Sequence, residues 1–115
     1  MIDEVVEVLN SLSLPFFYVK APKDSELPCV IYADTGVRNV AKSTSHQIRQ
    51  HSFTFYIYNP NEPTVIWDYL EQLDKALIDR GFLLGGKMDM QAEYSGDILI
   101  YFQSISYYKT IRELI

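Results

Sequence analysis

Residues 48–81, IRQHSFTFYIYNPNEPTVIWDYLEQLDKALIDRG, decide the fold, because they join a long aromatic strand to an amphipathic helix. In the first part, Phe53, Phe55 and Ile57 alternate with hydroxyl-bearing residues. Alternate residues of a strand face opposite sides, so this pattern predicts one apolar and one polar side. Pro60 ends the run, since proline cannot donate to a strand ladder.

The second part predicts a helix over residues 63–80. Pro63 suits the first helical position, where its missing N–H group would have no partner in any case. Gly81 provides a left-handed stop after the last turn. Apolar residues at spacings of four, three and four predict the buried stripe, which consists of Ile66, Leu70, Leu73 and Leu77.

The remaining sequence predicts elements that pack on this pair. The expected elements are a helix at 2–12 and strands at 16–19, 29–35, 88–94 and 98–108, with a turn or bulge at 85–86 and a short, frayed tail at 109–115. Strand 98–108 is apolar on both faces, which indicates a central strand or a face covered by another chain. We therefore predict one α+β domain over residues 1–115, with a four- to five-stranded, mostly antiparallel mixed sheet, two α-helices packed on it and a long hairpin loop.

That loop is expected at residues 36–47, GVRNVAKSTSHQ. Loops of this length within a small domain are usually functional or disordered. The sequence predicts an extended, mobile projection between strands 29–35 and 48–58.

Charge is distributed unevenly along the chain. No Asp or Glu occurs from Thr35 to Asn61, a window that contains Arg38, Lys42 and Arg49. The window carries a formal charge of +3 and the rest of the chain −8, which together give −5. The loop is either a solvated hairpin without a specific role, or a basic protrusion that contacts an acidic neighbour or a phosphate backbone.

Several function classes are disfavoured by composition. A net charge of −5 argues against wrapping of nucleic acid, which usually needs a basic face. The acidic start of the chain is unlike a signal peptide, and no apolar stretch approaches the roughly 20 residues of a membrane span. We therefore expect a protein without a membrane contact that is intracellular when made.

Catalytic and metal-binding arrangements are not evident. His46 and His51 have no nearby cysteine or acid that would complete a zinc site. Cys29 lies in an apolar run and is expected to be a small buried residue. We expect no catalytic residue, no cofactor and no metal ion, and hence no enzyme. Three acids recur on the predicted helix in a pattern more typical of a solvated face than of a metal site: Asp68, Glu71 and Asp74.

Tyrosines are frequent on the long strands, where five are found: Tyr56, Tyr58, Tyr101, Tyr107 and Tyr108. Tyrosine is favoured at protein interfaces because it offers a broad area with a polar tip. Its ordinary preference for strands explains the same distribution. Both interpretations are open at this point.

The order of elements resembles one family. A short helix leads to residues 27–32, LPCVIY, and a polar loop leads to residues 51–58, HSFTFYIY. A helix after Pro63 and a closing strand with the paired tyrosines 107–108 complete the pattern. Over about residues 1–108 the chain resembles the tail-terminator or tail-completion proteins, which join head to tail in long-tailed bacteriophages and prophages.

This resemblance implies a structural virion protein, made in the host cytoplasm and located in the tail or neck. Such proteins form a hexameric ring at the head-proximal end of the tail tube, stop tube elongation and provide the surface that joins the head. Their partners are copies of themselves, the tail tube protein and the head connector protein. DNA passes through the lumen without specific binding.

A ring built from one repeated contact needs two complementary surfaces on each subunit. From the charge pattern we infer a subunit or tube interface that consists of Arg38, Lys42, Arg49, Asp68, Glu71 and Asp74. Two alternatives are a head-completion or connector protein of the virion neck, and a small non-viral protein-binding domain that uses its tyrosine-rich sheet. Solution mass would separate the ring-forming proteins from the third class.

Overall fold

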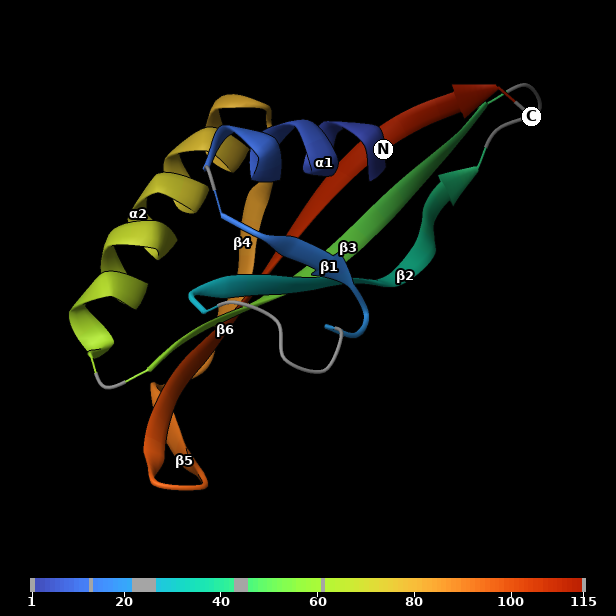
Figure 1. The fold of residues 1–115 in the computed structure, drawn as a ribbon. Helices are drawn as coiled ribbons and strands as arrows, with labels where there is room; N and C mark the ends of the chain where they lie inside the picture. Colours follow the sequence, from blue (N-terminus) through green and yellow to red (C-terminus); the bar gives the residue numbers. More distant parts are fainter. Residues whose placement is uncertain (1, 13, 22–26, 43–45, 61, 115) are drawn as a thin grey trace.

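The structure is a computed structural model that describes residues 2–12, 14–21, 27–42, 46–60 and 62–114 (Figure 1). Within these ranges the chain forms two helices and six strands: α1 (Ile2–Ser11), β1 (Phe16–Tyr18), β2 (Cys29–Lys42), β3 (His46–Pro60), α2 (Pro63–Asp79), β4 (Leu83–Lys87), β5 (Gln91–Ser95) and β6 (Ile98–Leu114). The predicted α+β class is confirmed.

The strands form one open, mixed sheet. Its order is β1-β2-β3-β6-β4, and β5 pairs with another part of β6. Strand β1 is parallel to β2, and every other pairing among the described strands is antiparallel. The sheet has more strands than predicted because residues 83–87 pair with β6 as well, although they contain a bulge between Leu84 and Gly86.

The core lies between the sheet and the two helices, which cover the same face of it (Figure 1). The predicted apolar side of β3 is buried, with Phe53, Phe55 and Ile57 at most 1% exposed. The predicted stripe of α2 is buried as well, and α1 contributes Val5, Val8 and Leu9. Burial of Leu70 and Leu73 is therefore confirmed.

The predicted loop at 36–47 is wrong for most of its length. Strand β2 continues to Lys42 and β3 begins at His46, while residues 43–45 lie outside the described residues. Two register shifts in β2, between Asp34 and Gly36 and between Asn39 and Ala41, explain the error. A bulge inserts an extra residue and breaks the period of two by which a strand is detected in a sequence.

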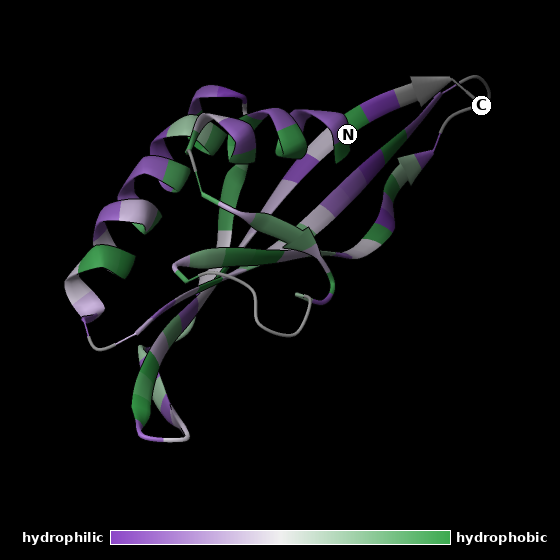
Figure 2. Ribbon diagram, viewed as in Figure 1, coloured by the Kyte–Doolittle hydropathy of each residue, from purple (hydrophilic) through white to green (hydrophobic). Residues whose placement is uncertain are grey.

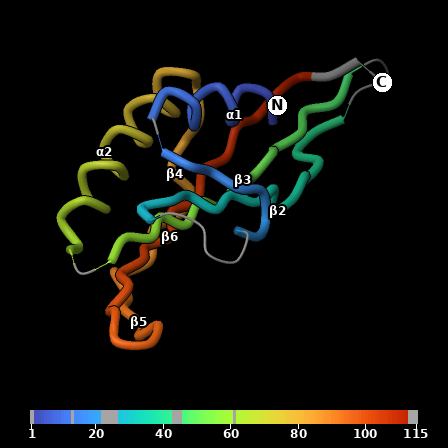
Figure 3. The backbone as a smooth tube through the Cα atoms, viewed as in Figure 1, coloured from blue at the N-terminus to red at the C-terminus, as the bar shows by residue number. Residues whose placement is uncertain are grey.

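The expected frayed tail is likewise strand, because β6 continues to Leu114 and pairs with β3 as far as His46. Three strands consequently extend together away from the helices (Figure 3). We call this part the arm and define it as residues 36–42 of β2, 46–50 of β3 and 110–114 of β6. It contributes to the elongated shape of the chain, whose principal extents are 58 × 25 × 24 Å.

Candidate assembly surfaces

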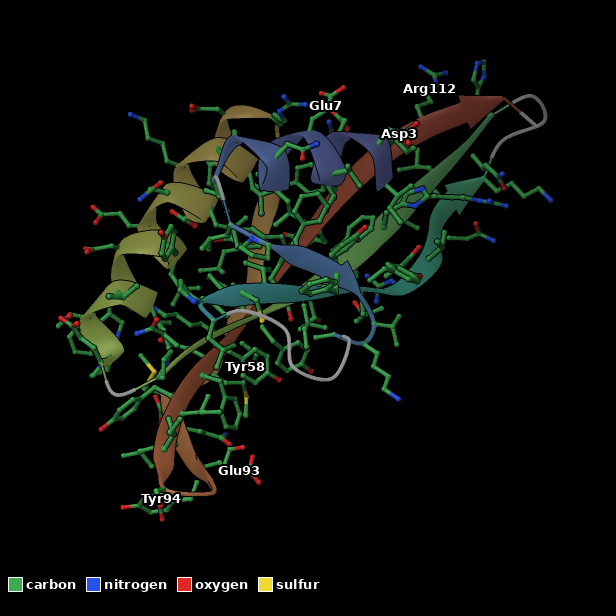
Figure 4. The ribbon with its side chains drawn as sticks, viewed as in Figure 1. Asp3, Glu7, Tyr58, Glu93, Tyr94 and Arg112 are labelled. Atoms are coloured by element: carbon green, nitrogen blue, oxygen red, sulfur yellow. The ribbon has the colours of Figure 1, made fainter. Side chains whose placement is uncertain are left out.

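The arm is a basic surface. Arg38 and Lys42 are exposed on β2. The Arg49 side chain crosses from β3, where its Nε atom donates to Asn39 Oδ1 at 3.2 Å. Arg112 of β6 lies opposite Ile48 of β3 and is exposed near the end of the arm (Figure 4).

Sequence reasoning missed Arg112 because it treated the C-terminal residues as a tail. The placement of Ile111 between the polar residues Thr110 and Arg112 was a signal for further strand, but it is too short to be decisive alone. The structure therefore adds a fourth basic residue to the three that the charge pattern selected.

The three acids of α2 that the charge pattern selected do not share one environment. Asp68 and Glu71 are exposed, as expected for a solvated helix face. Asp74 is partly buried, and its Oδ1 atom accepts a hydrogen bond of 2.5 Å from the hydroxyl of Tyr107. Tyr107 is fully buried, and burial together with the bond to Asp74 raises the pKa of its hydroxyl well above the ordinary value. Placing Asp74 on the exposed side of the helix was therefore wrong, since this side chain fastens α2 to β6.

Within one chain the arm and α2 lie on opposite sides of the molecule (Figure 1). The structure brings Arg38, Lys42 and Arg49 together on one side and places the α2 acids on the other. A contact between these two groups would therefore join different copies of the chain.

A groove lies beside the acidic part of α2. It has a volume of about 350 Å³ and is lined by Trp67, Leu70, Glu71, Asp74, Leu84, Lys87 and Ile105. Trp67 is 52% exposed and Leu84 51%, so two large apolar side chains meet solvent here. Figure 2 shows hydrophobic and hydrophilic residues alternating along α2, as expected for a helix with one buried side. The sequence did not reveal the groove, because Trp67 falls beside the predicted stripe and Leu84 is distant along the chain.

The face of the sheet opposite the helices carries tyrosines and hydroxyl groups. Tyr58 stacks on Phe102 with ring centroids 5.4 Å apart. Thr54 and Ser106 share a hydrogen bond of 2.8 Å across β3 and β6. Burial raises the pKa of the Tyr58 hydroxyl, and Glu93 of β5 adds to this effect (Figure 4). Because Tyr107 belongs to the core, the strand tyrosines do not form a single binding surface.

Three further observations concern metal ions, the cysteine and membrane-spanning helices. Among the described residues, no group of three or more His, Cys, Asp or Glu side chains is placed to hold a metal ion. Cys29 is buried as predicted, and burial raises the pKa of its thiol. No helix in the described part of the chain is both long and apolar enough to cross a membrane.

Comparison with known protein families and with curated proteins finds no match to this sequence. Among solved structures, the chain is similar to the gp17 protein of bacteriophage SPP1, with a TM-score of 0.57 and 17% sequence identity. The likeness covers 95% of this chain and 86% of that one. The fold is shared with a bacteriophage protein. At this identity the comparison shows the fold alone.

Proposed function

We propose that this protein is a tail-terminator or tail-completion protein of a long-tailed phage or prophage. In this role it forms a ring, with six subunits as the family resemblance implies, at the head-proximal end of the tail tube. The ring stops tube elongation and provides the surface that joins the head. The observation that carries the proposal is the fold shared with a bacteriophage SPP1 protein over nearly the whole chain.

The charge distribution supports self-association. The basic arm and the acidic side of α2 lie apart in one chain, so a contact between them repeats from subunit to subunit. A repeated head-to-tail contact closes into a ring when its rotation permits. Complementary charge would steer the subunits together and set their register.

We propose a structural role, without catalysis or a cofactor. The protein binds copies of itself, the tail tube protein and the head connector protein. The formal charge of −5 suits a lumen through which DNA passes without specific binding, since a negative surface repels phosphate. The virion tail or neck is the corresponding location.

Solution mass and capping of purified tail tubes test the proposal. The parent protein should form a ring alone or on contact with tube ends, and tubes capped by it should stop growing. A parent that stays monomeric and leaves tube length unchanged would contradict the function. A protein that joins the connector ring but never the tube would instead be a connector-type neck protein.

Charge reversal tests the role of the arm. Arg38→Glu combined with Lys42→Glu should weaken assembly and also reduce its sensitivity to salt, because salt screens pairs of surface charges. Lys20→Glu, which makes half of this change in net charge and lies outside the arm, is the control and should assemble like the parent. If the double variant assembles normally, the proposed charge contact would be contradicted, whereas the proposal of a ring would be unaffected.

A further inference from the structure

We propose that the groove between α2 and β4 receives the arm of the neighbouring copy, so that Trp67 and Leu84 contact Val37 and Val40 of that arm. The inference rests on the proposed function, because it assigns the contact by which the ring is built. It names as occupant a second copy of this chain.

The groove has the composition of a protein contact. Its floor includes Leu70 and Ile105, each 4% exposed, and its walls carry the half-exposed Trp67 and Leu84. Tryptophan is among the residues that contribute most to binding when a partner covers them. An apolar hollow with a polar margin is the usual arrangement of an interface centre and its rim.

The arm offers what such a groove requires. Val37 is 49% exposed and Val40 is 53% exposed, although both belong to strand β2. Arg38 lies between them, and Lys42 follows two residues after Val40. A partner strand therefore presents apolar side chains flanked by positive charge.

The charges of the two surfaces are complementary. Glu71 and Asp74 line the groove and Asp68 is exposed one turn earlier on α2, whereas Lys87 of β4 is the basic residue of the lining. Carboxylates therefore exceed ammonium groups here, even though Asp74 is engaged by Tyr107. We assign Glu71 as the nearest partner for Arg38, because it combines exposure with a place in the groove lining.

The single tryptophan of the sequence makes the contact measurable. Trp67 fluorescence should shift to shorter wavelength on ring formation, and quenching by acrylamide should fall by about half or more, because assembly removes the indole from water. The measurement is made first on rings without tubes, and on tube-bound rings if tubes are needed for assembly. Lys20→Glu serves as the control and should behave like the parent.

Charge exchange identifies the occupant. Arg38→Glu and Glu71→Arg should each weaken ring formation about tenfold, and the two changes in one chain should restore it to within a few-fold of the parent. This restoration distinguishes a direct pair from two independent losses.

The outcomes separate this inference from the proposed function. Rings that form while Trp67 stays as accessible as in the monomer, or a double variant no better than either single one, would overturn the groove assignment alone. A Trp67 signal that changes only when tubes are added to finished rings would make the tube protein the occupant and also overturn it. A parent that never forms rings or caps tubes would overturn the proposed function itself.

Discussion

Strand β3 passes through two regions that share a backbone ladder and differ in what surrounds it. In the body of the sheet, Phe53, Phe55 and Ile57 lie under the helices and are almost completely buried. In the arm, the residues from His46 to Gln50 are only partly covered, by neighbouring strands. Removing apolar area from water stabilises by about 25 cal/mol per Å², so the body carries the stability of the fold. The arm gains less from burial than the body does.

The largest expected difference comes from deleting core volume. Leu73 of α2 is fully buried against the sheet. Leu73→Ala should lower the free energy of unfolding by about 2–5 kcal/mol, because it loses apolar transfer energy and leaves a cavity. Denaturant unfolding followed by far-UV circular dichroism measures the change.

The matched substitution in the arm is Val37→Ala. Val37 is 49% exposed, so its loss should change the free energy of unfolding by no more than about 0.5 kcal/mol. If Leu73→Ala and Val37→Ala lowered the free energy of unfolding equally, the division between a stabilising body and a weakly packed arm would be wrong.

The next effect concerns the polar link inside the body. Tyr107→Phe removes the hydroxyl that donates to Asp74 and should lower the free energy of unfolding by about 1.5–3 kcal/mol, the range for hydrogen bonds to charged groups. Tyr94→Phe is the control, because Tyr94 is 72% exposed on the β5–β6 hairpin. Equal stability of the two variants would show that the bond to Asp74 contributes nothing.

The stability of the folded protein should depend on alkaline pH through Tyr107. Because the pKa of Tyr107 is raised in the folded protein, its hydroxyl keeps its proton where an unfolded tyrosine, with a pKa of about 10, loses it. The stabilisation is present below pH 10 and declines above it, by up to about 1.4 kcal/mol per pH unit. Tyr107→Phe should reduce this slope, as measured by unfolding of the parent and the variant between pH 9 and 11. Identical slopes in parent and Tyr107→Phe would contradict the assignment.

The two regions also differ in how well the sequence predicts them. The body follows its periodicity: the stripe through Leu70 and Leu73 and the alternation from Phe53 to Ile57 report directly which side is buried. Such patterns exist because one side faces a core. They predicted the helices, the hairpin of β2 with β3 and the α+β class.

The arm lacks this signal because its described residues are exposed or only partly buried, so neither face needs to be uniformly apolar. A bulge before Val37 and a second one at Val40 shift the period, and charged residues on an exposed strand look the same as those of a loop. The groove at Trp67 was missed for another reason, since Leu84 reaches it only through the pairing of β4 with β6. Contacts made by tertiary structure leave no local pattern in the sequence.

The smallest expected effects come from two ion pairs that attach α1 to the rest of the body. Arg80 Nη1 lies 2.5 Å from Glu7 Oε2, but the two side chains are 37% and 63% exposed. Lys109 Nζ lies 3.0 and 3.1 Å from the two oxygens of Glu4, is less exposed, and lies 5.2 Å from the centre of the Phe82 ring. Exposed pairs contribute about 0.2–1 kcal/mol, and salt screens them. Glu7→Gln should therefore lower the free energy of unfolding by less than Glu4→Gln does. The effect of Glu7→Gln should also be the first to disappear as the salt concentration is raised. Denaturant unfolding at low and high salt measures both, and a larger loss for Glu7→Gln would mean that the partial burial of Lys109 does not strengthen its pair.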